Sequence, residues 1–189
     1  MNKKKIGPQI LVYPMPAVLV GADVDKKPNF MTAAFCNIMA FKPPAVSVGI
    51  QRIRHTMKGI EANGTFSVNI PPVSMVKEVD WCGLYSGRKK DKSEIFNSFY
   101  GVLKNAPLIQ ECPLNLECRV KQTLDLGSHL MIVGEIVETY VNENCYADGK
   151  ADPEKIDPLV YIPTVRKYYR LGEFVADAFQ VGKEKEIKG

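Results

Sequence analysis

Two long stretches, residues 107–126 and 129–141, constrain the fold of this chain most strongly. They are joined by a short turn around Gly127, so we expect them to pair as long antiparallel strands. A shorter strand is predicted over residues 65–70, where apolar and polar side chains alternate before two prolines. Strands outnumber helices, and no regular strand–helix–strand alternation occurs. The predicted fold class is therefore mainly β, a closed antiparallel barrel with a few α-helices, rather than a doubly wound sheet.

Prolines, glycines and apolar spacing predict the other elements. The helix over 55–63 should end at Asn63-Gly64, a common stop signal. The segment 138–157 carries six acidic residues against two lysines and is expected to be a solvated loop. The remaining expected elements are strands over 9–21, 32–41, 45–50, 159–162 and 168–171, a hairpin turn over 22–29, and a helix over 73–84.

The composition is that of one globular domain. The chain has 189 residues, of which 46% are hydrophobic, enough for a substantial core in a single domain spanning residues 1–189. Its net charge of +4 is too small for a dedicated nucleic-acid binder. Charges or prolines interrupt every apolar run well before the roughly 18 residues that a membrane span requires. We therefore expect neither a nucleic acid nor a membrane as partner.

The cysteines favour a reducing compartment. Five of them, an odd number without CxxC spacing, argue against a disulfide framework and against a four-thiolate zinc site. Pro8, Pro14 and Pro16 interrupt the stretch in which a secretory signal would be apolar, and no small-residue cleavage site follows. The expected location is the cytoplasm, and we assign no metal ligands. A charged C-terminal tail is expected over residues 182–189.

Two basic segments point to an anion. Residues 51–58 carry a charge of +3 before and within a predicted helix start, where free backbone N–H groups favour phosphate. Thr56 is the expected cap of that helix. Residues 86–92 also carry +3, and Gly87 lets the backbone approach a ligand closely. Each segment alone is also compatible with solvated surface cations, but a single anionic ligand explains both.

Two further segments carry groups suited to a flat polar ring. Residues 29–37 mix small and aromatic side chains at a strand start, although an ordinary strand with a turn explains the same pattern. His129 follows the turn between the long strands and is able to donate a hydrogen bond or a proton, although such a histidine is often structural. No GxSxG, GxGxxG or GxxxxGK[ST] motif occurs, which disfavours hydrolases and the common nucleotide-binding loops.

In this order, these segments resemble the flavin reductase-like family with the FMN-binding split barrel, and within it most of all the flavoredoxins. The resemblance covers roughly residues 8–172, the expected domain core. The motifs that carry it are Pro28-Asn29-Phe30-Met31-Thr32-Ala33-Ala34, Lys42-Pro43-Pro44, Arg54-His55-Thr56, Asn63-Gly64-Thr65-Phe66-Ser67-Val68-Asn69, Ser86-Gly87-Arg88-Lys89-Lys90-Asp91-Lys92, and Gly127-Ser128-His129 with Gly134-Glu135-Ile136.

The resemblance implies a six-stranded Greek-key barrel that forms a homodimer, with non-covalent FMN near the subunit interface. It also implies roles for single residues. Lys92 is expected near the ring, where it would stabilise negative charge on the reduced flavin. His129 is the expected proton donor, and either Tyr168 or Tyr169 is expected to cover the ring. The implied cofactor-binding residues are Asn29, Thr32, Ala33, Ala34, Phe35, Gln51, Arg52, Arg54, Thr56, Lys92 and His129.

The function implied by this resemblance is electron transfer through FMN. The electron donor is NAD(P)H, in an oxidoreductase of the flavin reductase type, or a redox protein, in a carrier of the flavoredoxin type. The alternative is a flavin-binding module without turnover, a store or a sensor. The chain has no recognisable nicotinamide-binding fingerprint that would decide between NADH, NADPH and a protein donor.

Overall fold

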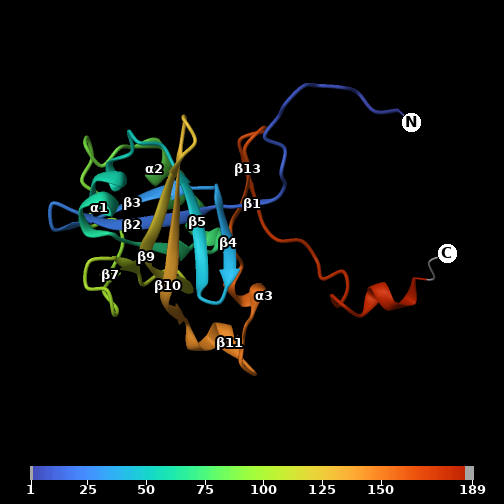
Figure 1. The fold of residues 1–189 in the computed structure, drawn as a ribbon. Coiled ribbons are helices and arrows are strands. Elements are labelled where there is room, and N and C mark those ends of the chain that lie inside the picture. The colour runs from blue at the N-terminus through green and yellow to red at the C-terminus, as the bar shows by residue number, and fades with distance from the viewer. Residues whose placement is uncertain (1, 186–189) are drawn as a thin grey trace.

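The computed structural model describes residues 2–185 and confirms a mainly β fold. Its main sheet has the strand order β3-β2-β6-β9-β10-β5-β4, and all neighbouring strands are antiparallel (Figure 1). The long pair expected from the sequence forms its β9–β10 hairpin. The strands are β2 (Val18–Val24), β3 (Lys27–Ala33), β4 (Cys36–Phe41), β5 (Pro44–Ile50), β6 (Thr65–Ile70), β9 (Leu114–Asp125) and β10 (Leu130–Val141).

The two edges of this sheet meet, because β3 and β4 lie at opposite ends of the strand order but only Ala34 and Phe35 separate them. The three residue steps from Ala33 to Cys36 span at most about 11 Å of extended chain. The backbone N–H of Gly49 donates to the Phe35 carbonyl oxygen at 2.7 Å, which holds this crossing against β5. Counted as one bent strand, β3 and β4 give the six strands expected from the resemblance.

Two helices pack against the barrel (Figure 1), one against its interior core and the other on the outer face of β2 and β3. Helix α1 (His55–Asn63) has the predicted bounds and ends at Gly64, whose left-handed conformation (φ 64°) lets its N–H bond to Ile60 O. The expected cap is wrong: Arg54 occupies the N-cap position, without a side-chain capping bond. The second predicted helix is a 3-10 turn, η1 (Val73–Met75), followed by α2 (Val76–Leu84).

Several expected strands have different bounds, and the one expected over 168–171 is β14 (Lys167–Tyr169). The strand over 9–21 begins only at Met15, because residues 9–14 are exposed and have no pairing partner among the described residues. The strand over 32–41 breaks at Ala34-Phe35, where the chain crosses between the sheet edges. The strand over 107–126 begins at Leu114, after the short β8 (Leu108–Ile109) and a turn. The hairpin turn over 22–29 narrows to Asp25-Lys26, both at positive φ.

Short elements pack beside the barrel. A small sheet joins β1 (Met15–Pro16), β13 (Val160–Ile162) and β14 (Lys167–Tyr169). The acidic segment 138–157 is not a plain loop, because Cys145 and Ile156 anchor it in the interior. The other short elements beside the barrel are β7 (Ser98–Phe99), η2 (Glu143–Cys145), β11 (Tyr146–Ala147), β12 (Lys150–Ala151) and α3 (Pro153–Ile156). The 3-10 turn η3 (Val181–Glu184) lies in the C-terminal segment, away from the barrel (Figure 1).

The core has two parts because β2 is buried on both faces. Val18, Val20 and Ala22 point into the barrel, whereas Ala17 and Leu19 point to the layer formed with α2. This explains the unbroken apolar run before Gly21. A strand with only one buried face would alternate with polar residues.

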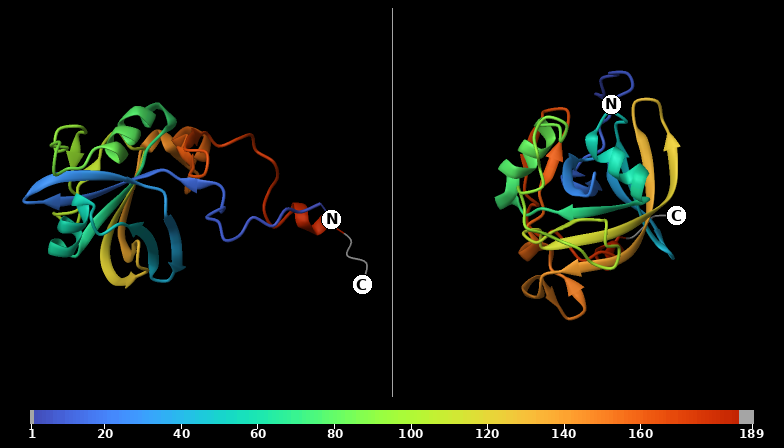
Figure 2. Two further views of the ribbon diagram at one scale, coloured as in Figure 1. Left: turned by 90° about the horizontal axis from the view of Figure 1, so that it is seen from above. Right: turned by 90° about the vertical axis from the view of Figure 1, so that its left-hand side faces the viewer.

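Both terminal segments extend from the same side of the barrel (Figure 2). Of the expected charged tail, residues 182–185 are described, and residues 186–189 lie outside the described part. Among the described residues, no helix combines the length and apolar character needed to cross a bilayer.

Candidate functional site

The two basic segments meet at the start of α1. Gly87 presses against this helix, since a Cβ added to it would clash with the side-chain oxygen of Asn29 and lie 2.7 Å from the His55 ring. A larger residue here would force the Asn29 or His55 side chain to shift, so glycine allows this close approach of the two segments. The start of a helix presents free N–H groups and a positive dipole end. The sequence-based expectation that one location unites both segments agrees with this geometry.

The place where residues 86–92 meet the start of α1, here called the basic corner, is electropositive. Burial lowers the pKa of His55, and the nearby charges of Arg88 and Lys58 lower it further, more than Asp25 raises it. Lys58 is itself paired with Asp25 at 2.8 Å, whereas Arg88 has no carboxylate partner among the described residues. Arg54 is half-buried and donates to the Gly83 carbonyl oxygen at 3.3 Å, at the C-terminal end of α2. These donors suit the phosphate of a nucleotide.

Asn29 and Thr56 stand together behind this corner. The Asn29 side-chain amide donates to the Thr56 hydroxyl at 2.7 Å, and both residues are buried. This bond joins β3 to the first turn of α1. It also explains why Thr56 does not cap its helix, since its hydroxyl lies one residue inside the helix and faces Asn29.

Two neighbouring cavities share Ala34. One, of about 280 Å³, is bordered by Thr32, Ala33, Arg54 and Tyr168. The other, of about 450 Å³, is bordered by Phe35 and His129. The segment that we expected to face a flat ring thus lies between the two cavities, and Arg54 of the basic corner borders the smaller one.

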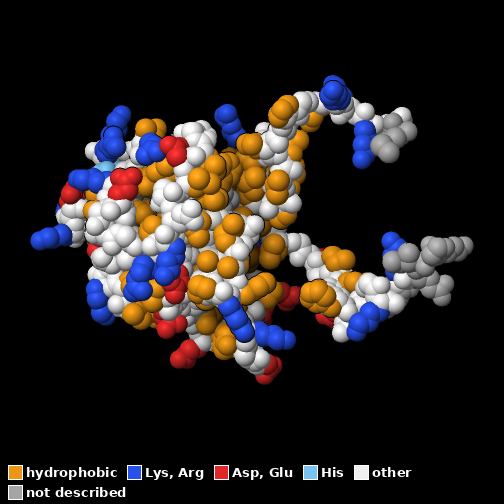
Figure 3. Space-filling model, in the orientation of Figure 1, with side chains coloured by type: hydrophobic (Ala, Val, Ile, Leu, Met, Phe, Trp, Pro, Cys, Tyr) orange, Lys and Arg blue, Asp and Glu red, His pale blue; other side chains and the backbone are white. Residues whose placement is uncertain are grey.

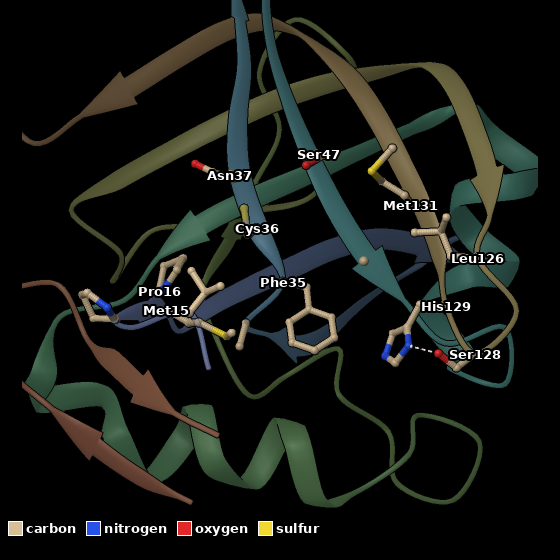
Figure 4. A pocket seen from close by; sticks show the side chains of 14 residues that line it. Met15, Pro16, Phe35, Cys36, Asn37, Ser47, Leu126, Ser128, His129 and Met131 are labelled. Atoms are coloured by element: carbon tan, nitrogen blue, oxygen red, sulfur yellow. Dashed lines mark hydrogen bonds between the residues drawn. The ribbon is translucent and has the colours of Figure 1, made fainter. Parts of the chain in front are cut away.

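Phe35 and His129 lie side by side in the larger cavity (Figure 4). Their ring centroids are 5.2 Å apart, with the planes tilted by 50°. Nδ1 of His129 is 3.0 Å from the Ser128 hydroxyl oxygen. Whichever of the two atoms donates, this bond engages Nδ1 and leaves Nε2 for a ligand.

Lys92 does not point into either cavity. It is 3% exposed, and its ammonium donates to the carbonyl oxygens of Phe30 at 3.0 Å and Cys82 at 2.8 Å. These bonds tie β3 to α2, next to the Trp81 ring. Burial lowers the pKa of Lys92. The structure thus shows Lys92 joining β3 to α2. A place for Lys92 near the flavin ring stays a prediction.

Arg52 also lies outside the two cavities that share Ala34. Its guanidinium bonds to Asp125 at 2.7 Å, and it borders a third cavity with Met57 and Ile60, on another side of α1. Gln51 is half-buried between β5 and α1 and borders neither of the two cavities that share Ala34. Arg52 and Arg54, two positions apart before α1, therefore border different cavities, which their spacing did not predict.

Tyr168, rather than Tyr169, borders the smaller cavity. Its hydroxyl donates to Asp80 at 3.0 Å, and its ring lies 5.3 Å from that of Tyr161. Burial, together with the bond to Asp80, raises the pKa of Tyr168. Sequence reasoning missed Asp80, because a carboxylate on the polar side of α2 carries no mark of a partner 88 residues away.

The cysteines of the site are not activated. Cys36 borders the larger cavity, and burial raises the pKa of its thiol to about 12. Cys82 is buried in α2, where burial raises its pKa to about 11. Packing, as expected, accounts for both, since nucleophilic thiols need a lowered pKa.

The structure thus combines a closed mainly β barrel with an electropositive helix start beside a cavity. Residues 11–172 match the model of the flavin reductase like domain, and the chain belongs to this family.

The similar proteins narrow the comparison. The structure resembles flavoredoxin from Methanosarcina acetivorans, at 43% identity over 97% of this chain and 98% of that chain, with a TM-score of 0.94. It also resembles flavoredoxin of Desulfovibrio vulgaris (Miyazaki F), at 36% identity over 95% and 99% of the two chains, with a TM-score of 0.88. The FMN reductase (NADH) RutF of Agrobacterium fabrum is 24% identical over 60% of this chain and 64% of its own length. Family and fold together support a flavin-binding redox role.

Proposed function

We propose that this protein binds FMN non-covalently and passes electrons through it, from NAD(P)H or from a redox protein. The observation that carries the proposal is the corner where Gly87 presses the second basic segment onto the start of α1. A phosphate monoester carries a charge of about −2 near neutral pH. Arg54, Arg88 and the helix N–H groups are the donors that would hold it. The similarity to flavoredoxins and to an NADH-dependent FMN reductase supports the same role.

The chemistry divides between the group and the chain. Bound FMN supplies hydride and electron transfer, and the protein supplies binding, orientation and local charge. The segment 32–35 would carry the ring, and Tyr168 would cover it from the side of the smaller cavity. When protonated at both ring nitrogens, His129 would deliver the Nε2 proton to a reacting atom in the larger cavity, beside the Phe35 ring.

We also propose that the protein acts as a homodimer in the cytoplasm. Strand β4 exposes large apolar side chains, among them Ile38 and Met39 at 52% and Phe41 at 91%. Hydrophobic side chains gather on the face of the barrel that the terminal segments flank (Figure 3). Exposed apolar patches of this kind are typical of protein interfaces, and a second copy is the partner that the resemblance implies. Five free thiols agree with a reducing compartment.

The test is a visible absorption spectrum of the purified protein, followed by anaerobic addition of NADH. We expect flavin bands and FMN in the supernatant after heating. Bleaching by NADH would assign the reductase role. Bands that persist with NADH but bleach with a reduced carrier protein would assign the carrier role. Bands that neither donor bleaches would indicate a flavin store. A colourless protein that takes up no added FMN would contradict the proposal.

A further inference from the structure

The larger cavity has an unusual chemical lining. Its fourteen lining residues, all within the described chain, include no Lys, Arg, Asp or Glu (Figure 4). Its volume of about 450 Å³ lies within the roughly 300–1,000 Å³ typical of small-molecule sites. Met15, Phe35, Leu126 and Met131 supply apolar walls.

The arginines near this cavity in the sequence, Arg52 and Arg54, do not border it. Arg52 is the basic residue nearest in sequence to the β5 wall, and it is bound by Asp125 outside the cavity. Arg54 borders the smaller cavity instead. A ligand with a charged group here would lose hydration without gaining a counter-charge, which is costly. An uncharged ring would lose little and gain apolar contact.

The polar groups of the cavity suit a carbonyl ligand. His129 stands beside the Phe35 ring, and its Nδ1 is engaged by Ser128, so that Nε2 is left for a ligand. Ser47 and Asn37 add uncharged polar groups from β5 and β4. A flat ring stacked against Phe35 would bring a carbonyl oxygen toward this imidazole.

From these observations we propose that the larger cavity binds an uncharged planar quinone, which accepts electrons from the reduced flavin. This inference rests on the proposed function. Conversion of a quinone to a hydroquinone takes up two electrons and two protons. Reduced FMN gives a hydride, which is two electrons and one proton, and returns to its oxidised form. A His129 protonated at both ring nitrogens gives the second proton from Nε2 and is then reprotonated by solvent. The NAD(P)H or carrier protein of the proposed function reduces the flavin again.

The first experiment measures binding. Isothermal titration of the FMN-loaded, oxidised protein uses 2-methyl-1,4-naphthoquinone as the neutral probe and 1,4-naphthoquinone-2-sulfonate as the anionic probe. We expect the neutral probe to bind at least ten-fold more tightly. Equal affinities, or tighter binding of the sulfonate, would overturn the inference.

A substitution that adds a positive charge at the rim of the cavity localises the site. Leu126 is 59% exposed at the cavity rim. Leu126→Lys should raise the affinity for the sulfonate at least five-fold and leave the neutral probe within two-fold, with Leu126→Met as the control. If Leu126→Lys changes neither affinity, the quinone binds elsewhere and the inference is wrong.

The last experiment tests electron transfer. Holoprotein is photoreduced without oxygen, with EDTA as the sacrificial electron donor, and is then mixed with the neutral quinone. The flavin bands should return with one quinone consumed per FMN. Bands that do not return would overturn the acceptor role. Absence of bound FMN at the outset would contradict the proposed function itself, whereas bound FMN without a preference for the neutral quinone contradicts this inference alone.

Discussion

The amide of Asn29 and the hydroxyl of Thr56 form a buried hydrogen bond of 2.7 Å between β3 and α1. This bond fixes the start of the helix relative to the strand that leads into the two cavities. Both partners belong to the motifs by which the chain resembles its family. Their contribution is to hold the basic corner in shape.

Thr56→Val should therefore destabilise the protein. The change keeps the side-chain volume but leaves the Asn29 amide without an acceptor, which costs about 1–3 kcal/mol of unfolding free energy. Urea unfolding followed by circular dichroism measures it. Thr123→Val, at an exposed position of β9, is the control and should lie within about 0.5 kcal/mol of the parent. Equal effects of the two changes would contradict a role for this bond.

Arg54→Gln should weaken FMN binding about ten-fold or more, because a hydrogen bond from a charged donor is worth about 1.5–3 kcal/mol. Arg52→Gln is the matched control, since Arg52 bonds to Asp125 away from the basic corner. It should change the dissociation constant less than about three-fold. Quenching of flavin fluorescence measures both. A larger effect at Arg52 would restore the assignment made from sequence and reject the one made from geometry.

Lys92→Met should lower the unfolding free energy by about 2–4 kcal/mol, because it leaves the carbonyl oxygens of Phe30 and Cys82 unpaired in the interior. Thermal and urea unfolding of the apoprotein check this expectation. The electrostatic role implied by the resemblance has its own readout, since loss of the cation should make the flavin midpoint potential more negative. An unchanged potential would leave Lys92 as a brace only.

Tyr168→Ala should weaken FMN binding several-fold, whereas Tyr169→Ala should leave it nearly unchanged. Only Tyr168 borders the smaller cavity and bonds to Asp80, and Tyr169 is 48% exposed. Tyr168→Phe separates the ring from the hydroxyl, and we expect it to retain most of the binding while losing about 1 kcal/mol of stability. Equal losses of FMN affinity at both tyrosines would show that Tyr168 has no special place.

Acid should destabilise the segment 86–92 through Asp91. The pKa of Asp91 is lowered to about 2, chiefly by the backbone N–H of Ser93 and further by the Ser93 side chain and Lys27. The unfolded chain then binds more protons than the folded protein between about pH 4 and pH 2, so stability falls as the pH drops through this window. Urea unfolding at pH 5, 4, 3 and 2 should show this fall, and Asp91→Asn should make it shallower. The same slope in both proteins would contradict the linkage.

Local spacing predicted much of this molecule. Helix α1, strand β6 and the β9–β10 hairpin follow from apolar periodicity and from Gly64 and Gly127, because each depends on neighbours within a few residues. The order of the motifs also predicted the family. Thr56 failed as a cap because its hydroxyl found a partner 27 residues away.

The sequence by itself determined the fold class, the two basic segments and the segment 29–37 that we expect to face a flat ring. Only the tertiary structure decided how these segments combine. The β3 and β4 edges meet at Ala34-Phe35, and Lys92 is buried. Arg54 borders the smaller cavity whereas Arg52 bonds to Asp125, and Tyr168 rather than Tyr169 borders the smaller cavity. The physical reason is the same in each case. A side chain's direction is set by hydrogen bonds and packing with residues far along the chain, and local spacing carries no record of those partners.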